Sequence, residues 1–340
     1  MLIRMLPLLG KTLAELQEVA LSVGLQKFAG KQLAEWLYVR RVTSFDEMTN
    51  ISLKGREALK ANYTIGRHAP VKEAVSIDGT RKYLFQIGEQ FVETVYIPEE
   101  DRTTLCVSTQ AGCKMGCKFC MTGTLGFHGN LSAADILNQI FYFDDLSNLV
   151  FMGEGEPMDN LDNVLRALEI MTAPYGSAWS PKRITVSTVG IPAMKRFLDE
   201  SECHVAVSMH NPFAVERVQI MPAEKLFSIT EVVNLLKQYD FSHQRRVSFE
   251  YICWAGQNDT MRHAKELLRL LKGLNCRINL IRFHAGVEDI KNERRFPASD
   301  EKQMEFLRDY LTEHGLTTTI RRSRGEDILA ACGMLVNSLQ

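Results

Sequence analysis

The pattern of hydrophobic and polar positions predicts helices near the start of the chain. Residues 10–62 read as helical, because apolar side chains recur at helical spacing from Leu13 to Ala20. The run KQLAEWLYVRRV repeats this pattern and ends in basic residues, which suit a helix C-terminus. The segments DGTRKYLFQIG and QFVETVYIP then alternate apolar and polar residues around Asp78 and Gly79, which predicts a β-hairpin.

From about residue 102 onward, short β-rich runs alternate with helix-like stretches. The β-rich runs are TLCVST, NLVFMG, RITVST, HVAVSMH, RVSFEYI, RINLIRFH and TTTIRR. The helix-like stretches include residues 132–146, 160–172, 228–239, 259–273 and 299–314. This alternation predicts a parallel sheet with covering helices. We therefore expect an α/β protein, in which six or seven such units can curl into a complete or partial barrel of the TIM type.

These patterns predict four regions. They are a small helical accessory domain (residues 1–70), a β-hairpin linker (71–98), the barrel (99–327) and a C-terminal segment with Cys332 (328–340). In such barrels the chemistry gathers where strands end and loops begin.

Polar and glycine-rich segments follow most strands of the predicted barrel. The first strand leads into CKMGCKFC, the second ends in GEGEP, the third in STVG, the fourth in SMHN and the sixth in His284. Turn residues occur at such places in any barrel, but the set of segments together predicts a site at this end.

The composition is that of an ordinary globular protein, with 45% apolar and 24% charged residues. No apolar run approaches the roughly 18 residues that a membrane span needs, and the first residues lack a signal-peptide cleavage site. We therefore expect a cytoplasmic protein with no membrane partner. The net charge is 40 − 41 = −1, whereas residues 1–70 carry 10 − 6 = +4. This excess fits a solvated surface or a small domain that faces RNA.

Eight cysteines in a long chain without an export signal indicate metal binding or chemistry more than a disulfide framework. The C-x3-C-x2-C triplet can bind three irons of a [4Fe-4S] cluster and leave the fourth open for S-adenosylmethionine. Zinc with a remote fourth ligand and three buried thiols are the alternatives, and the glycine-rich strand ends favour the cluster. Three other cysteines fall in or beside apolar runs and read as small buried residues: Cys203, Cys253 and Cys276.

Several motifs together resemble one family. CKMGCKFC resembles the radical S-adenosylmethionine signature. With it, VETVYIP, CVSTQAGCKMGCKFCMTGTLGF, GEGEPMDN, ITVSTVG, SMHNPF and RGEDILAACG resemble the bacterial RNA adenine-C2 methyltransferases called RlmN, over nearly the whole chain. The resemblance implies a partial (β/α)6 TIM-like radical S-adenosylmethionine barrel with a small N-terminal helical domain and a short β extension. It implies an enzyme that methylates adenosine C2 in 23S ribosomal RNA, at the peptidyl-transferase centre, and in transfer RNA beside the anticodon. It also implies two S-adenosylmethionine molecules per turnover.

The resemblance assigns roles to individual residues. The cluster ligands would be Cys113, Cys117 and Cys120. The cofactor contacts would be Gly155, Glu156, Ser187, Ser208, Met209, His210 and His284. Family members usually have Asn where this chain has His284. Phe119, just before the last cysteine of the triplet, could pack beside the adenine.

Two further cysteines define the implied mechanism. Adenine C2 is electron-poor and cannot attack the methyl group of S-adenosylmethionine directly. In the family's scheme, the Cys332 sulfur first accepts a methyl group from one cofactor molecule. A radical from a second cofactor molecule then removes a hydrogen atom from this methyl group, and the resulting carbon radical adds to C2. Cys106 then attacks the Cys332 sulfur, which gives a disulfide and releases the product. Glu93 matches the family's proposed proton acceptor. The disulfide must be reduced before the next turnover, which fits a reducing compartment and an electron donor such as flavodoxin or ferredoxin.

Arginines are candidates for RNA contact, because a guanidinium group can bind phosphate through two hydrogen bonds. Arg321, Arg322 and Arg324 precede Cys332, and the segments QRRV (244–247) and YVRR (38–41) are further candidates. Charged runs are more often solvated, so each assignment is open. The adenosine would have to leave its stack to expose C2. We expect the protein to act as a monomer.

Other functions remain open. The nearest is methylation of adenine C8, which confers resistance to ribosome-targeting antibiotics; those relatives tend to have Ala where this chain has Pro157, and SFDEMTNIS looks more like the C2 group. A non-catalytic RNA-binding protein with a zinc knuckle is a different class. An electron carrier is another, and it needs neither Cys332 nor the cofactor-binding strand ends.

Overall fold

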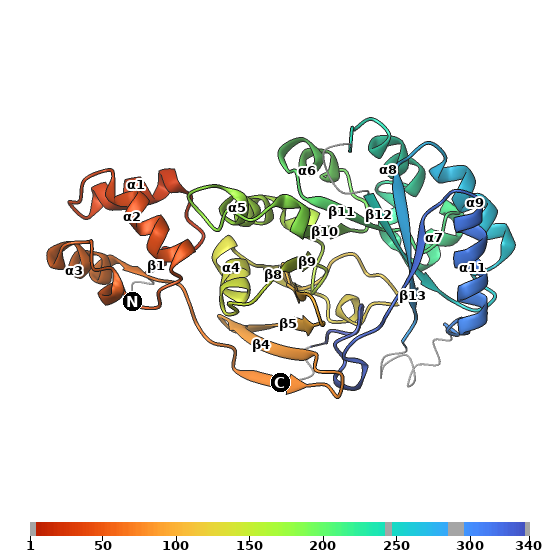
Figure 1. Ribbon diagram of the computed structural model, residues 1–340, viewed down its shortest axis with the longest axis horizontal. Helices are drawn as coiled ribbons and strands as arrows, with labels where there is room; N and C mark the ends of the chain where they lie inside the picture. The colour runs from red at the N-terminus through yellow and green to blue at the C-terminus, as the bar shows by residue number, and fades with distance from the viewer. Residues whose placement is uncertain (1–4, 242–246, 285–295, 337–340) are drawn as a thin grey trace.

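The computed structural model describes residues 5–241, 247–284 and 296–336, which form a small helical part joined to a larger α/β part (Figure 1). A capping box between Thr12 and Glu15 starts the first helix of the small part. In the run KQLAEWLYVRRV, residues 31–39 are helical as predicted, with a π-helical turn at Glu35–Val39, whereas residues 40–42 at its basic end lie beyond the helix. The elements are β1 (Leu6–Pro7), α1 (Leu13–Ser22), α2 (Ala29–Ala34), η1 (Glu35–Val39), η2 (Phe45–Glu47), α3 (Leu53–Asn62) and β2 (Tyr63–Thr64).

The larger part is built on a sheet of ten strands in the order β14-β13-β12-β11-β10-β9-β6-β5-β4-β3. Neighbours from β6 to β14 in this order are parallel, and those from β3 to β6 are antiparallel. The strands are β3 (Lys72–Val75), β4 (Arg81–Ile87), β5 (Gln90–Pro98), β6 (Thr103–Cys106), β9 (Asn148–Phe151), β10 (Ile184–Thr188), β11 (His204–Ser208), β12 (Val247–Cys253), β13 (Cys276–Arg282) and β14 (Thr318–Arg321). Within the described residues β3 and β14 remain unpaired edges, so the barrel is partial, and the predicted fold class is confirmed.

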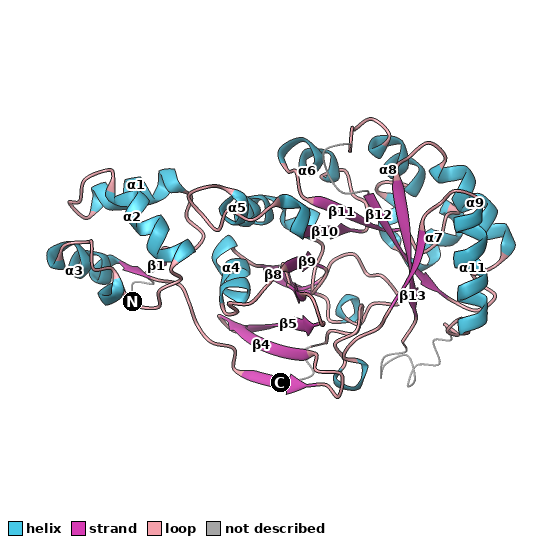
Figure 2. Ribbon diagram, viewed as in Figure 1, coloured by secondary structure: helices cyan, strands magenta, loops and turns pink. Residues whose placement is uncertain are grey.

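Helices lie around the outside of the parallel strands (Figure 2). They are α4 (Ala133–Phe141), α5 (Leu161–Thr172), α6 (Met194–Glu200), α7 (Ala214–Ile220), α8 (Ile229–Leu236), α9 (Met261–Leu271) and α11 (Glu301–Glu313). Leu137 and Ile140 of α4 and Val186 of β10 are wholly buried in the core that these layers share. The sequence patterns above named no helix at α6 or α7, because seven residues are too few to show a helical period.

The predicted hairpin region forms three strands that extend the main sheet. A turn around Asp78 joins β3 to β4, and Gly79 takes the positive φ of +84° that the turn needs. Strand β5 pairs with β6, so the hairpin continues the sheet of the barrel. The C-terminal segment returns to this region (Figure 1), where the Gly325 amide donates to Asp78 Oδ2 at 3.0 Å.

Two arginines attach the helical part to the barrel. Arg41 Nη1 donates to the carbonyl of Phe143 at 2.8 Å, and Arg67 Nη2 donates to the carbonyl of Phe141 at 2.6 Å. Both carbonyls lie at the C-terminal end of α4, where a cation is favoured by the helix dipole.

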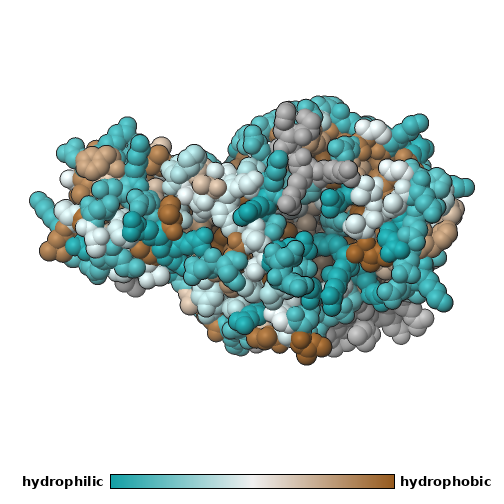
Figure 3. All heavy atoms as spheres, in the orientation of Figure 1, coloured by the Kyte–Doolittle hydropathy of each residue, from teal (hydrophilic) through white to brown (hydrophobic). Residues whose placement is uncertain are grey.

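The face in Figure 3 is mostly hydrophilic, and its hydrophobic side chains lie in small separate groups. Across the residues that the structure describes, we find no helix with the length and apolar character needed to cross a bilayer.

Candidate active site

The loop after β6 carries Cys113, Cys117 and Cys120. Its two ends are joined by a small antiparallel sheet of β7 (Gln110–Gly112) and β8 (Phe127–Asn130). Gly112 has a φ of +70°, and a Cβ atom there would lie 1.9 Å from the carbonyl oxygen of Gly126. The Cys113 amide donates to the same oxygen at 2.8 Å. The loop is therefore fixed at its base before the first thiol.

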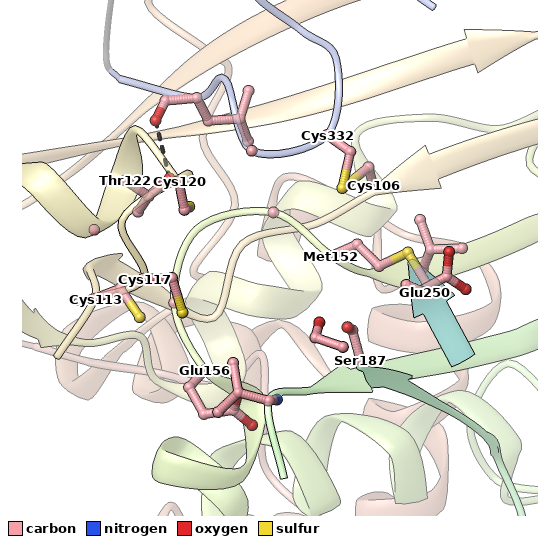
Figure 4. A pocket seen from close by; sticks show the side chains of 18 of the residues that line it. Cys106, Cys113, Cys117, Cys120, Thr122, Met152, Glu156, Ser187, Glu250 and Cys332 are labelled. Atoms are coloured by element: carbon pink, nitrogen blue, oxygen red, sulfur yellow. Dashed lines mark hydrogen bonds between the residues drawn. The ribbon is translucent and has the colours of Figure 1, made fainter. Parts of the chain in front are cut away.

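The triplet of thiols lines a cavity at the carboxyl ends of the parallel strands (Figure 4). The cavity holds about 1200 Å³ of space, part of it open to solvent. Burial raises the pKa of Cys113 to about 12 and raises the pKa values of Cys117 and Cys120 as well. Cys120 contributes to the shift at Cys113, and both other thiols contribute to the shift at Cys117. A metal group needs these sulfurs as thiolates, and its positive charge would lower their pKa values.

Cys106 and Cys332 meet at the edge of the same cavity, and Figure 4 shows their side chains pointing toward one another. Burial, followed by the neighbouring Cys332, raises the pKa of Cys106 to about 12. Burial raises the pKa of Cys332 to about 11, although the Arg321 guanidinium opposes this shift. Cys332 is nonetheless exposed, because it faces the open space of the cavity. Both thiols are free.

The GEGEP segment places a buried carboxyl group in the cavity. Gly155 has a φ of +95°, and a Cβ atom there would lie 2.5 Å from Cβ of Gln110. Glu156 is only 2% exposed, and its carboxylate accepts hydrogen bonds from the amides of Val189 at 2.9 Å and Met158 at 3.1 Å. Burial raises the pKa of Glu156 to about 7. A cationic ligand beside it would favour the charged form.

The ends of β10 and β11 add further polar groups to the cavity. Ser187 and Ser208 line it together with His210. The His210 backbone has a φ of +53°, and its Nδ1 accepts a hydrogen bond from the Ile252 amide at 3.0 Å. Burial lowers the pKa of His210 to about 3, so the ring is neutral. Phe119 packs edge-on against His210 with ring centroids 4.7 Å apart, and it also lines the cavity.

Two of the predicted cofactor contacts do not line this cavity. Met209 is fully buried, and its side chain belongs to the main core. His284 follows β13, and its Nε2 lies 2.6 Å from Ser323 Oγ and 3.4 Å from Glu326 Oε1. Neither residue is part of the thiol-lined cavity, and the predicted roles of both stay predictions.

Glu93 also lies behind the cavity lining. It is wholly buried, and its Oε1 forms an ion pair with Lys82 Nζ at 3.0 Å. Its other oxygen accepts a hydrogen bond from the Val336 amide at 3.0 Å. The carboxylate is therefore engaged by two partners, and its role as a proton acceptor stays a prediction.

The candidate RNA contacts differ in their surroundings. Arg321 lines the cavity and donates to Glu250 Oε2 at 3.2 Å. Arg322 is exposed, and Arg324 lies near two carboxylates of the hairpin region.

Within the other two candidate RNA-binding segments, YVRR and QRRV, the residues also differ in exposure and in whether the structure describes them. In YVRR, Tyr38 is buried, Arg40 is exposed and Arg41 is half-buried against the barrel. In QRRV, residues 244–246 lie outside the described residues, and Val247 begins β12.

Comparison with known proteins places this architecture in a family. Residues 6–65 match the family described as Ribosomal RNA large subunit methyltransferase N-terminal domain, and residues 107–271 match the Radical SAM superfamily. A Bacteroides thetaiotaomicron protein named "Probable dual-specificity RNA methyltransferase RlmN" is 59% identical over 98% of this chain and 97% of its own. The chain belongs to the RlmN family.

Two less similar proteins also match along nearly the whole chain. The Geobacter sulfurreducens "Dual-specificity RNA methyltransferase RlmN" is 39% identical over 98% of this chain and 93% of its own. A crystal structure of a radical SAM methyltransferase from Sphaerobacter thermophilus is 34% identical, covers 97% of this chain and 99% of its own, and matches with a TM-score of 0.90. The predicted resemblance is thereby confirmed, and this RlmN-family protein is a radical SAM methyltransferase.

Membership of the RlmN family implies a [4Fe-4S] cluster and S-adenosylmethionine. Among the described residues, no three His, Cys, Asp or Glu side chains are grouped so that they could hold one metal ion. A cluster places different demands on its ligands, because each of three thiolates binds a different iron and the sulfurs need not meet at one point. Three thiols along one cavity fit that requirement better than they fit a single zinc ion.

Sequence reasoning missed several residues of the RlmN-family site. Glu250 is 5% exposed on β12 and faces the cavity, where it pairs with Arg321. Met152 lines the cavity just before GEGEP. The sequence signal for Glu250 was an acidic residue inside the otherwise apolar run VSFEYI. A second missed residue, Lys82 of the hairpin region, does not line the cavity but is fully buried.

Proposed function

We propose that this RlmN-family protein methylates C2 of adenosine in 23S ribosomal RNA and in transfer RNA beside the anticodon. The observation that supports this most is the meeting of Cys106 and Cys332 at the cavity that also receives the three thiols of the triplet. An electron-poor carbon needs a covalent carrier for the incoming carbon unit, and an exposed thiol at the cavity can serve as one. A second thiol beside it can then release the product.

The cavity has one group of residues that could hold the cluster and another that could bind S-adenosylmethionine. When bound, the cluster and S-adenosylmethionine supply a methyl group and, from a second cofactor molecule, the means to remove a hydrogen atom. The buried carboxylate of Glu156 would bind the cationic amino group of S-adenosylmethionine, which would lower the pKa of Glu156 from about 7. The residues in these roles would be Cys113, Cys117 and Cys120 for the cluster, and Gly155, Glu156, Ser187, Ser208 and His210 for S-adenosylmethionine.

Cys332 would carry the methyl group. Its sulfur must act as a thiolate, because the thiolate is the nucleophilic form. With a pKa of about 11, only a small fraction of Cys332 is ionised near neutral pH. The Arg321 guanidinium lowers this pKa, and a cationic cofactor in the cavity would lower it further. The carrier is thus activated most when the cofactor is present.

Cys106 would release the product. By that stage the Cys332 sulfur would be bonded through a CH2 group to adenine C2, and C2 would have lost its hydrogen as a proton, with the unpaired electron of the adduct returned to the bound cluster. The Cys106 thiolate attacks this sulfur, an S–S bond forms, and the S–C bond breaks with its electron pair going to carbon, which takes up a proton to become the methyl group. The two thiols are left oxidised as a disulfide, so two electrons must restore them. The proximity of the two side chains supports this step.

The RNA would approach the cavity past exposed cations. Arg322 is exposed ten residues before Cys332, and Arg40 is exposed on the helical part. Both could bind phosphate. We propose that the protein acts as a monomer in the cytoplasm, with flavodoxin or ferredoxin as the electron donor.

The deciding experiment is mass analysis of nucleosides from RNA digested after reaction with the anaerobically purified protein and S-adenosylmethionine. The proposal expects 2-methyladenosine in both 23S ribosomal RNA and transfer RNA. Detection of 8-methyladenosine as the sole product would replace the proposal with the C8 activity. A colourless protein that binds zinc and leaves RNA unmodified would assign it to a non-catalytic class.

A further inference from the structure

The position of the segment that carries Cys332 is set by contacts with other parts of the chain. After η7 (Glu326–Ile328), the described residues 329–336 form neither helix nor strand. Leu329 has a φ of +53°, a backbone conformation that side chains other than glycine rarely adopt. Such a conformation persists only where surrounding contacts hold it. The contacts around this loop therefore decide where Cys332 lies.

Lys82 and Glu93 hold the two ends of the loop of residues 329–336. Lys82 Nζ donates to the carbonyl oxygen of Leu329 at 3.2 Å. The Glu93 carboxylate accepts a hydrogen bond from the amide of Val336 at 3.0 Å. The two side chains form an ion pair at 3.0 Å, and neither is exposed. One buried ion pair thus connects the start of the loop to its end.

The register of the sheet aligns this ion pair with Cys106. Lys82 of β4 lies opposite Val95 of β5, and Val95 lies opposite Cys106 of β6. Because opposite residues on antiparallel strands have their side chains on the same face, these three side chains form one row across the sheet. At about 4.8 Å between strands, Lys82 stands roughly 10 Å from Cys106 along the row.

The loop packs on this row between its two ends. Val95, in the middle of the row, forms an apolar cluster with Ala330 and Leu335 of the loop, and Cys106 packs against the same cluster. Further along, the Thr122 hydroxyl donates to the carbonyl of Leu335 at 2.9 Å (Figure 4). The start of the loop therefore lies over Lys82, and Cys332 comes to lie beside Cys106.

We propose that Lys82 is a positioning residue that sets the approach of Cys332 to Cys106. A buried ammonium group is costly unless it is paired and hydrogen-bonded, and an apolar residue would avoid that cost on this strand. Lys82 does not line the cavity, so it acts through the loop and its partner Glu93. This inference rests on the proposed function in one respect, because that function requires the two sulfurs to react with each other.

The test measures how fast Cys106 and Cys332 form a disulfide, and it needs neither RNA nor S-adenosylmethionine. The full-length protein, purified anaerobically with its cluster, is treated with diamide, which takes two electrons and two protons from a pair of thiols. Peptide mass spectrometry follows the Cys106–Cys332 disulfide over time. In Lys82→Met the rate should fall about ten-fold or more, because a small displacement of a reacting atom has a large effect on rate.

A matched control separates positioning from general loss of stability. Leu307→Ala removes a fully buried side chain from α11, which is not part of the loop or the row, and it should destabilise the protein while leaving the disulfide rate unchanged. If Leu307→Ala slows the disulfide as much as Lys82→Met does, the slowing reflects loosening of the whole protein and the proposal is overturned.

A second variant covers the case in which Lys82→Met does not fold because it leaves Glu93 buried and unpaired. The double variant Lys82→Met/Glu93→Met removes both charges and both anchors of the loop. It should fold, and it should form the disulfide slowly. A folded double variant that forms the disulfide at the wild-type rate would overturn the proposal. Product identity is independent of this assay, so finding 8-methyladenosine together with a slow Lys82 variant would overturn only the proposed function.

Discussion

Two groups of cysteines face one cavity, and they are built in different ways. Cys113, Cys117 and Cys120 lie in one short loop whose ends are joined by the small β7–β8 sheet. Cys106 and Cys332 come from a barrel strand and from the end of the chain. The triplet depends on local structure, whereas the pair depends on the whole sheet and on contacts such as those of Lys82. The two groups are in contact, because the Met121 amide donates to the carbonyl of Gly333 at 2.8 Å, but we expect removal of a single thiol from one group to leave the other in place.

The largest expected effect comes from the triplet. Cys117→Ala should remove the brown colour and the bound iron of the anaerobically purified protein, and RNA methylation should fall about a thousand-fold or more, because the lost thiolate is a ligand of the cluster. Iron analysis and visible absorption measure the first result. Cys276→Ala, at a buried thiol away from the cavity, is the control and should keep both properties.

The same variant tests whether loss of a thiol from the triplet affects the Cys106–Cys332 pair. Cys117→Ala should still form the Cys106–Cys332 disulfide with diamide at close to the normal rate, since it removes only a thiol and keeps the Met121 and Thr122 hydrogen bonds to the carbonyls of Gly333 and Leu335. A loss of this reaction would show that the two groups are not independent.

The next effect comes from the pair. Cys106→Ala should stop turnover after one cycle and accumulate a covalent protein–RNA adduct, because no thiol remains to attack the Cys332 sulfur. Denaturing gel electrophoresis after reaction detects the adduct. A Cys106→Ala variant that turns over normally would refute the resolving role of Cys106.

A smaller effect is expected in the pH dependence of Cys332 alkylation, which should differ from that of an unperturbed thiol. Burial raises the pKa of Cys332 to about 11, so its thiolate fraction should rise about ten-fold per pH unit from pH 7 to pH 10. Alkylation of Cys332 in the cofactor-free protein, followed by peptide mass spectrometry, should show this rise without a plateau. An unperturbed thiol has a pKa of about 8.5 and would reach a plateau above roughly pH 9, so a plateau there contradicts the assigned environment.

The smallest effect concerns His284. Because His284 is bound to Ser323 and does not line the cavity, His284→Ala should change the affinity for S-adenosylmethionine less than about two-fold. Glu156→Ala should weaken it about ten-fold or more, since a charge-assisted hydrogen bond is lost. Equilibrium binding to both variants makes the comparison, and equal losses would place His284 in the cofactor site.

Sequence patterns predicted the local features of the molecule well. Alternating strands and helices gave the partial barrel, and the buried thiols Cys203, Cys253 and Cys276 lie where apolar runs predicted them. The triplet is a local motif, so its spacing was visible without a fold.

Features set by distant parts of the chain were not visible in the sequence. The position of Lys82 shows the reason, because its strand looks half-exposed until the C-terminal segment covers it. Arg41 was a candidate for phosphate, yet it turns toward the end of α4. His284 follows a strand as predicted, but its side chain turns toward Ser323. In each case a contact between remote segments decides the direction of a side chain.

The most direct test of the account follows the methyl group through Cys332. The anaerobically purified protein is given S-adenosylmethionine with a labelled methyl group, and intact-protein and peptide mass spectrometry locate the label before and after RNA is added. We predict one labelled methyl group on the Cys332 peptide that moves to adenosine C2 when RNA is present. Transfer of label to RNA by a Cys332→Ala variant would contradict it.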